Sequence, residues 1–307
     1  MIKVVMINDC AFVGENLGKH FCGVHIKRSR GLFDKTVGLA WRILKAEGDL
    51  YHVNYLLQDC FIANKLGKKP LVGHAHGSDL RMGLKSFLWR RIVKNNLSSC
   101  SKVLVSTPDL LDVARSFRSD VVYLPNLVDE SLFFVKNGEF SKKVKVLIAS
   151  EQNWIVKGSN IALLALSLIK DKVDVSIIAH GKDLFKSMML AHSLRLELNL
   201  LPMVPHEKMN EYYWSHDVVI DRFSLGSMGV VSLEAIRCGR PVLCFVSSAF
   251  PEHKDFPLLD LLDPQKIAAL VLDREALWFK EFVFVNKYHC CEYVIPKLSE
   301  IYEEVLD

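Results

Sequence analysis

The sequence predicts an α/β protein built from two Rossmann-like β/α/β domains that face a central cleft. The chain has 307 residues, which at about 100–200 residues per domain indicates two domains. Short apolar runs alternate with longer helical patterns, as in parallel sheets with crossover helices. This alternation stops near residue 130 and then starts again. Ligands of such sheets bind at the carboxyl ends of the strands, so we expect the site there.

The first half of the chain predicts one parallel sheet. Runs rich in β-branched and apolar residues predict the strands, and the longer segments between them predict the helices. The expected strands are residues 4–7, 51–55, 71–74, 103–106 and 121–124, and the expected helices are residues 35–46, 56–66, 84–95 and 108–116.

The second half predicts another sheet after a break. The pattern is lost over residues 129–141, where Asn137 and Gly138 form a turn signal, and we expect the interdomain linker there. We therefore expect domains over residues 1–135 and 136–280, and a C-terminal helix at 281–307 that packs back toward the first domain. The expected strands are residues 144–149, 173–178, 199–203, 218–220 and 241–245, and the expected helices are residues 158–169, 182–191, 206–214 and 230–238.

The composition is that of a globular protein with unevenly distributed charge. Hydrophobic residues make up 50% and charged residues 24% of the chain, which excludes a disordered protein. The net charge is +4. Residues 1–140 carry 20 Lys and Arg against 13 Asp and Glu, a balance of +7, and the other 167 residues carry 19 against 22, a balance of −3. A basic first half suggests that the two domains have different partners.

The cysteines and the start of the chain favour a cytoplasmic location. The eight Cys form no C-x-x-C pair and several lie in apolar runs, so free thiols in a reducing compartment are expected. The apolar run at residues 1–8 is too short for a signal peptide. No run approaches the ~18 apolar residues of a membrane span. We expect a cytoplasmic protein with at most peripheral membrane contact.

Residues 221–242 are the most informative segment. A strand ends near Asp221, a loop of small residues follows, and a helix starts near Gly229. Backbone N–H groups at a helix start bind anions, and glycine lets a phosphate approach closely. Glu234 lies about one and a half turns into this helix, where a carboxylate suits a pair of ribose hydroxyls. The alternative is an ordinary strand–loop–helix turn in which glycine only separates the elements.

This segment resembles the nucleotide-binding core of retaining GT-B glycosyltransferases, specifically glycosyltransferase family 4. That core has a glycine loop, a Leu-Glu-Ala helix and a Cys-Gly-x-Pro-Val exit, which are similar to Gly229, residues 233–235 and residues 238–242 here. The resemblance implies a GT-B fold with the acceptor on the first domain and a UDP- or GDP-sugar donor on the second. Further segments resemble landmarks of the family in the same order, at residues 74–81, 106–109, 124–129, 149–158 and 204–217.

The resemblance also implies roles on the donor side. Lys157, which is followed by Gly158, would neutralise the diphosphate as it leaves, and Arg222 could supply a second cation. Glu234 would hold the ribose, and the backbone around Val204 would contact the base. The remaining residues of the expected diphosphate site are Ser227, Gly229 and Val230.

On the acceptor side, the resemblance implies that His76 touches the transferred sugar or the reacting oxygens. Gly14 lies in a loop that the family places toward the acceptor, and Asp79 follows His76 in the same turn. Asp79 could instead only cap the next helix. His74 and His76 could also be a metal pair, but no third ligand is near in sequence, so we expect no metal.

Two departures from the family pattern affect the donor site. The family usually has two glutamates separated by seven residues, and the position of the first is Gly226 here. The family also usually has an arginine five or six residues before Lys157, where this chain has Glu151 and Gln152. We interpret the chain as a divergent branch of the family.

Residues 84–95 combine basic and apolar side chains at helical spacing. Such a helix with Trp89 can lie on an anionic membrane, or it can pack its apolar face on the core and leave its charges in water. No nucleic-acid-binding motif accompanies the basic charge, so we expect no nucleic-acid partner. The cations are Lys85, Arg90, Arg91 and Lys94, and the apolar residues include Leu84, Phe87, Leu88 and Ile92.

The predicted function is a retaining, metal-independent glycosyltransferase that needs no cofactor beyond its nucleotide-sugar substrate. The acceptor would be a saccharide or a lipid-linked glycan. Two alternatives stay open: a non-catalytic GT-B subunit that binds a nucleotide and a partner enzyme, and a GT-B-like epimerase. An epimerase needs carboxylates near the sugar, and Gly226 counts against it.

Overall fold

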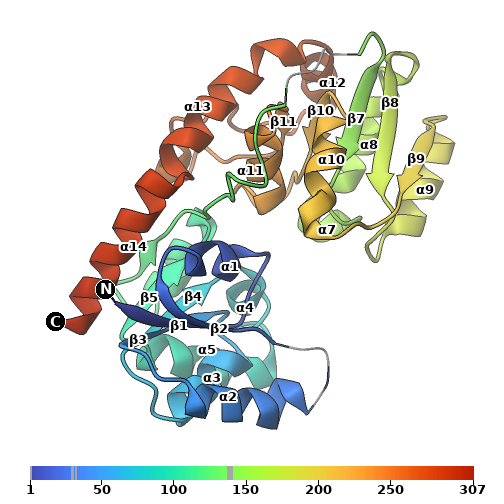
Figure 1. Ribbon diagram of the computed structural model, residues 1–307. Helices are drawn as coiled ribbons and strands as arrows, with labels where there is room; N and C mark the ends of the chain where they lie inside the picture. The colour runs from blue at the N-terminus through green and yellow to red at the C-terminus, as the bar shows by residue number, and fades with distance from the viewer. Residues whose placement is uncertain (1, 29–30, 32, 137–140) are drawn as a thin grey trace. The chain divides into compact units, whose positions relative to one another are not determined.

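The computed structural model describes residues 2–28, 31, 33–136 and 141–307, which fold into two compact units (Figure 1). The first unit comprises Met1–Leu127 and His289–Asp307, and the second comprises Val128–Tyr288. No helix in these ranges is long and apolar enough to cross a membrane.

These bounds differ from the expected ones at residues 135 and 280. Val128 and Phe133 are buried in the core of the second unit, so the division falls after Leu127. The turn signal at Asn137 and Gly138 lies outside the described residues.

The first unit contains a six-stranded parallel sheet in the order β2-β1-β3-β4-β5-β6. Every residue of β3, β4 and β5 is buried, because helices cover both faces of the sheet. β2 is an addition to the expected strands; three of its five residues are exposed, so the sequence shows no apolar run there. The strands are β1 Lys3–Ile7, β2 Cys22–Ile26, β3 Leu50–Asn54, β4 Leu71–Ala75, β5 Lys102–Val105 and β6 Val122–Tyr123.

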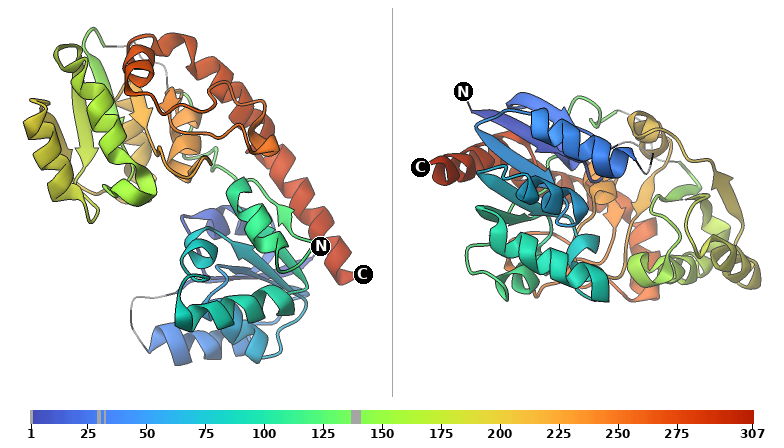
Figure 2. Two further views of the ribbon diagram at one scale, coloured as in Figure 1. Left: turned by 180° about the vertical axis from the view of Figure 1, so that it is seen from behind. Right: turned by 90° about the horizontal axis from the view of Figure 1, so that it is seen from below.

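Three of the helices, α2, α3 and α5, lie side by side on one face of this sheet (Figure 2). α3 lies between the other two and packs against both. The helical segments are α1 Val13–Gly18, η1 Asp34–Gly38, α2 Leu39–Lys45, α3 Gln58–Lys65, α4 Ser78–Arg81, α5 Phe87–Ser99, η2 Pro108–Leu110 and α6 Leu111–Arg115.

The last helix of the chain, α14 (Cys291–Leu306), belongs to the first unit. The hydroxyl of its buried Tyr302 lies 2.6 Å from Nδ1 of His52, in the middle of the sheet. Lys102 at the start of β5 pairs with Glu304 at 2.5 Å. The expected helix at 281–307 is therefore two helices, of which α13 (Trp278–Tyr288) lies in the second unit.

The second unit contains a five-stranded parallel sheet in the order β11-β10-β7-β8-β9. Its strands are β7 Val144–Ile148, β8 Val173–Ile178, β9 Leu198–Leu201, β10 Val218–Ile220 and β11 Val242–Leu243. Its other helical segments are α7 Trp154–Lys157, α8 Ser159–Ser167, η3 Lys170–Lys172, α9 Leu184–Ser193, η4 His206–Lys208, α10 Met209–Trp214, α11 Val230–Arg237, η5 Pro251–His253, α12 Pro264–Leu272 and η6 Arg274–Ala276.

A buried carboxyl group ties α13 to the sheet of the second unit. Glu281 is 0% exposed and accepts a 2.8 Å hydrogen bond from the backbone N–H of Val242, at the start of β11. Burial raises the pKa of Glu281 well above its ordinary range, and the single hydrogen bond offsets this only in part. The group therefore favours its neutral form.

Replacing Glu281 with glutamine should make stability less dependent on pH. The folded-state pKa lies above the ordinary 4.5, so the folded chain holds more protons than the unfolded chain as pH rises past that value. This group alone then lowers the free energy of unfolding by up to about 1.4 kcal/mol per pH unit. In urea denaturation between about pH 5 and 8, Glu281→Gln should show a shallower decline than the wild type. Glu281→Ala, which lacks the acceptor for Val242, should be less stable than both. Parallel pH profiles of the wild type and Glu281→Gln would contradict this account.

Candidate functional site

A buried aspartate organises the loop between β10 and α11 in the second unit. Asp221 directly follows β10 and is 0% exposed. It accepts hydrogen bonds from the hydroxyl of Ser150, after β7, and from the hydroxyl of Ser232 in α11 at 2.7 Å. Nε of Arg222 lies 3.7 Å from its Oδ2 atom. The carboxylate thus joins the ends of two neighbouring strands to the start of a helix.

The surroundings of Asp221 keep it ionised. Burial would raise its pKa, but the charges of Arg222 and Lys157 and the hydrogen bonds from Ser150 and Ser232 outweigh burial, and the pKa is lowered. The ionised carboxylate of Asp221 therefore attracts two cations, Arg222 and Lys157. The sequence marked it only as a strand end; the signal available was an acidic residue next to Arg222 after an apolar run.

The end of α7 is attached to the same loop. The backbone N–H of Phe223 donates to the carbonyl of Lys157 at 2.7 Å, and the Ser224 hydroxyl donates to the carbonyl of Val156. Gly158 follows with a φ of 66°, and a Cβ there would lie 3.2 Å from the backbone of Phe223. The backbone of the half-buried Lys157 is therefore bound to the loop that carries Asp221 and Arg222, and its charge acts on Asp221.

Gly229 leaves the space that the Arg222 side chain occupies. A Cβ at Gly229 would lie 2.1 Å from Nη2 of Arg222 and 2.7 Å from Oδ2 of Asp221. Its φ of −94° is open to any residue, so the need for glycine is one of space. α11 begins at Val230 without a side-chain cap. A guanidinium thus lies against a helix start, where the positive end of the helix dipole favours a bound anion. Ser227 is buried and Val230 is half-buried in the same loop.

Glu234 lies inside the second unit, where both of its oxygens are hydrogen-bonded. Its Oε1 lies 2.6 Å from Nε2 of His206, and its Oε2 accepts the hydroxyl of Tyr213 at 3.0 Å. Glu234 is 4% exposed; burial raises its pKa, and the bonds to His206 and Tyr213 oppose the shift only in part. Each oxygen keeps a further lone pair for a ligand hydroxyl. Val204 is half-buried close to His206.

The contact partners His206 and Tyr213 are functional candidates that sequence reasoning missed. Both lie in the segment that resembles the family's helix before the sugar-nucleotide loop, but nothing in their spacing indicates a bond to Glu234. His206 also packs against the ring of Phe133, with centroids 5.2 Å apart.

Gly226 is the first of the two positions at which the chain departs from the pattern of the family that it resembles, and its backbone conformation requires glycine. Its φ is 67°, and a Cβ there would lie 2.8 Å from Cβ of Ser247 and 3.3 Å from the rings of Phe245 and Phe250. A glutamate at this position would need a different loop.

Gln152 is the second position at which the chain departs from that pattern, and its side chain is buried in the fold. Gln152 is 0% exposed, its Nε2 donates to the carbonyl of Ser150 at 3.2 Å, and its backbone packs on Gly181. Glu151 is half-buried, and its carboxylate lies 3.9 Å from Nε2 of His180.

In the first unit, polar side chains gather at the carboxyl edge of the sheet. Nε2 of His76, just after β4, lies 3.1 Å from Oδ1 of Asn54, the last residue of β3. A Cβ at Gly14 would lie 2.5 Å from Nδ2 of Asn54, and the N–H of Gly14 donates to Asp9 at 3.0 Å. Asn54 therefore connects the two predicted residues, Gly14 and His76. Sequence reasoning missed it, because its position at a strand end was its only signal.

These contacts fix the protonation of His76. The amide nitrogen of Asn54 donates to the carbonyl of Asn8 at 3.4 Å, so Oδ1 of Asn54 is the acceptor for His76. His76 then carries its proton on Nε2. Burial lowers the pKa of His76 to about 3, so the ring is neutral and its Nδ1 is an acceptor.

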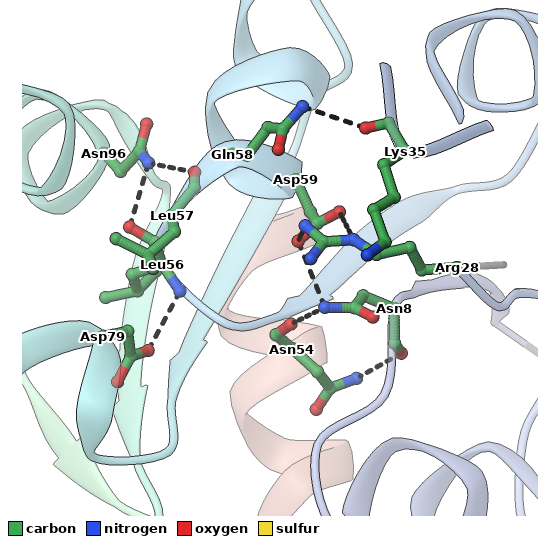
Figure 3. A network of polar contacts seen from close by, with 10 residues as sticks. All are labelled: Asn8, Arg28, Lys35, Asn54, Leu56, Leu57, Gln58, Asp59, Asp79 and Asn96. Atoms are coloured by element: carbon green, nitrogen blue, oxygen red, sulfur yellow. Dashed lines mark hydrogen bonds and ion pairs between the residues drawn. The ribbon is translucent and has the colours of Figure 1, made fainter. Parts of the chain in front are cut away.

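Asp79 builds the turn that carries His76. Its carboxylate is 0% exposed and accepts the backbone N–H groups of His76 at 3.2 Å, Gly77 at 2.8 Å and Leu80 at 3.0 Å. It also accepts the N–H of Leu56 at 3.0 Å (Figure 3). Burial raises the pKa of Asp79, and these four donors oppose the shift. All four donors belong to the backbone, so the carboxylate shapes the chain around His76.

A second buried aspartate holds the adjoining loop. Asp59 at the start of α3 pairs with Arg28 and accepts the amide of Asn8 at 3.1 Å (Figure 3). Asn8 has a φ of 61°, so this network also holds a strained backbone at the end of β1. Across the ranges that the structure describes, no group of three or more His, Cys, Asp or Glu residues could hold a metal ion.

Part of the second unit is similar to a known protein family. Residues 130–253 match the family model "Glycosyl transferases group 1". No curated protein matches the chain.

Several solved structures share the fold. HepE from Anabaena, determined with UDP and glucose, has a TM-score of 0.75 at 16% identity, over 99% of this chain and all of that one. Sucrose-phosphate synthase from Thermosynechococcus elongatus has a TM-score of 0.76 at 12% identity, over 98% of each chain. TarM from S. aureus has a TM-score of 0.62 at 15% identity, over 89% of this chain and 59% of that one. The predicted fold class, α/β with two Rossmann-like GT-B domains, is confirmed. The matched segment, residues 130–253, contains Asp221, Arg222 and Gly229.

Proposed function

We propose that the protein transfers a sugar from a UDP- or GDP-sugar to an acceptor and retains the configuration of the anomeric carbon. The observation that carries the proposal is the convergence of Lys157 and Arg222 on Asp221 beside the Gly229 helix start. We call these four residues the candidate donor site. They lie within the segment that matches the glycosyltransferase model, and HepE, which has the same fold, was determined with UDP-glucose.

The main catalytic effect would be stabilisation of the leaving diphosphate. When the bond between the anomeric carbon and the diphosphate oxygen breaks, its electron pair stays on that oxygen. Lys157 and Arg222 would neutralise the developing charge, and the N–H groups near Ser227, Gly229 and Val230 would bind the phosphate oxygens. Two side-chain cations and a helix start supply this positive charge, so we propose a reaction without a bound metal.

The nucleoside would lie next to the candidate donor site. Glu234, held by His206 and Tyr213, has lone pairs left for the ribose hydroxyls. The backbone around Val204 would contact the base. His206 and Tyr213 would then orient the carboxylate without touching the diphosphate.

The first unit would supply the acceptor side. The neutral His76 has an acceptor at Nδ1, which suits a hydroxyl of the sugar or of the acceptor. Gly14 and Asp79 shape the loops beside it, so their role in binding the acceptor would be indirect. The acceptor would be a saccharide or a lipid-linked glycan, and the protein would act in the cytoplasm.

One observation favours a second candidate function. The family that the chain resembles usually has a sugar-binding glutamate where this chain has Gly226, and a diphosphate-binding arginine where it has Glu151 and the buried Gln152. Gly226 and Gln152 are both fixed by the surrounding fold. A non-catalytic GT-B subunit that binds a nucleotide would keep the candidate donor site and lose turnover. A panel of UDP- and GDP-sugars separates the two functions. Nucleotide-dependent thermal stabilisation with no product or hydrolysis would favour the binding subunit.

Lys157→Ala should lower turnover by roughly 10²–10³-fold, because it removes one of two cations from the leaving group. The measurement is nucleoside diphosphate release from the best donor of the panel. The matched control is Lys266→Ala, which removes an exposed lysine from α12 of the same unit and should leave the rate unchanged. Equal loss in both variants, or wild-type turnover in Lys157→Ala, would remove Lys157 from the mechanism.

Gly229→Ala should weaken nucleotide binding by about tenfold or more, since the new methyl group displaces the Arg222 guanidinium from the helix start. Calorimetric titration with UDP and GDP measures the change. Gly18→Ala is the control, because a Cβ there makes only an ordinary contact, 3.6 Å from Met6. If Gly229→Ala binds the nucleotide as tightly as Gly18→Ala does, Arg222 has no part in the site.

A further inference from the structure

The start of α5 exposes large apolar side chains. Phe87 is 94% exposed, Leu88 is 76% exposed and Trp89 is 37% exposed. The hydroxyl of Ser86 caps the helix by accepting the N–H of Trp89 at 3.4 Å, so the helix start is well defined. The described residues of the first unit leave the Phe87 ring uncovered. Side chains of this size and exposure mark a surface that contacts something else.

Unpaired cations surround these side chains. Lys85, Arg90 and Arg91 are exposed, and among the described residues none of the three forms an ion pair. No acidic residue occurs between Asp79 and Asp109 in the sequence. A shallow surface groove is lined by Lys85, Ser86, Phe87, Leu88, Arg90, Arg91 and Lys94. The patch is therefore apolar at its tip and purely basic at its rim.

A second exposed apolar stripe runs along η1 and α2, which α3 separates from α5. Val37, Trp41 and Leu44 recur at helical spacing and are 58%, 56% and 56% exposed. Nζ of Lys45 lies 3.9 Å from the centre of the Trp41 ring. α2 and α5 both flank α3 on one face of the sheet, so the two apolar stripes belong to the same side of the first unit (Figure 2). We call these two stripes, together with Lys85, Arg90 and Arg91, the basic–apolar face.

We infer that the basic–apolar face binds the surface of an anionic phospholipid membrane. Apolar tips that reach the acyl boundary, with Lys and Arg at headgroup level, are the features by which helices lie on such a surface. The charge argues for lipid over a second copy of this chain, because the face has no acidic residue in α5 to pair with the cations of another copy. The inference rests on this face alone. Together with the proposed function, it would place a lipid-linked acceptor near the first unit.

Vesicle flotation of the full chain tests the inference. The wild type should float with phosphatidylcholine vesicles that contain phosphatidylglycerol, and far less with pure phosphatidylcholine. Phe87→Ser/Leu88→Ser should reduce partitioning of the protein onto the vesicles by at least about tenfold, because it removes the two apolar side chains that would insert into the bilayer. The matched control is Phe185→Ser/Met189→Ser on α9 of the second unit, whose side chains are 73% and 54% exposed, and it should bind like the wild type.

Substituting the cations provides a second, independent test in the same vesicle experiment. Arg90→Glu/Arg91→Glu should weaken binding to the anionic vesicles by more than about fivefold per residue, and added salt should weaken wild-type binding. Circular dichroism and the thermal shift with UDP show whether each variant is folded and whether its nucleotide site is intact. A failure of the proposed function would therefore appear as a lost UDP response with vesicle binding unchanged.

Three results would overturn the inference. The first is no vesicle binding by the wild type. The second is equal binding by the wild type and Phe87→Ser/Leu88→Ser. The third is self-association of the wild type that this double substitution abolishes while no variant binds vesicles, which would assign the face to a second copy of the chain.

Discussion

The buried carboxylate of Asp221 is the interaction on which the candidate donor site depends. Lys157 and Arg222 carry like charges, and the Arg222 guanidinium lies next to the positive end of a helix, so a negative charge is needed to offset their repulsion. Removing Asp221 from water costs several kcal/mol, and the two cations and two serine hydroxyls offset that cost. These side chains carry two positive charges and one negative charge, with the positive end of α11 beside them. A nucleoside diphosphate is a matching anion, so the contacts that hold the loop together also leave the net positive charge that would attract it.

Three fully or nearly buried carboxyl groups in the second unit show why burial alone does not decide charge. Asp221 has a lowered pKa because two cations lie near it. Glu281 has one backbone donor and no cation among the described residues, so its pKa is raised well above its ordinary range. Glu234 lies between these cases, with His206 and Tyr213 as partners and a raised pKa. Only Asp221 is built to hold cations. Glu234, with mixed partners, is the carboxyl group that can still accept hydroxyl donors.

The sequence predicted the features that depend on local pattern. Apolar runs located the central strands of both sheets, and glycines located the loop before α11. It could not predict β2, an edge strand, because most of its residues are exposed and the sequence therefore has no apolar run there. It also missed the partners of site residues. The contacts of Glu234 with His206 and of His76 with Asn54 depend on how strands and helices pack in three dimensions. Residues that are far apart in the sequence show no local pattern that predicts such a contact. The boundary between the units lies earlier than expected for the same reason, since Val128 and Phe133 belong to the second unit by their packing in its core.

The ion pairs show which basic residues of the first unit are neutralised within the fold and which are not. In the first unit, Arg28, Arg81 and Lys102 are each paired with a carboxylate and serve the fold. Lys85, Arg90 and Arg91 are not paired among the described residues, and they surround the exposed Phe87. Charges that only kept the chain in solution would not need to gather around the most exposed aromatic ring of the unit. α5 also begins just beyond the turn that carries His76, on the carboxyl side of the sheet. A membrane bound there would lie close to the edge at which we place the acceptor, so basic charge, apolar exposure and the acceptor side would all meet at one end of the first unit.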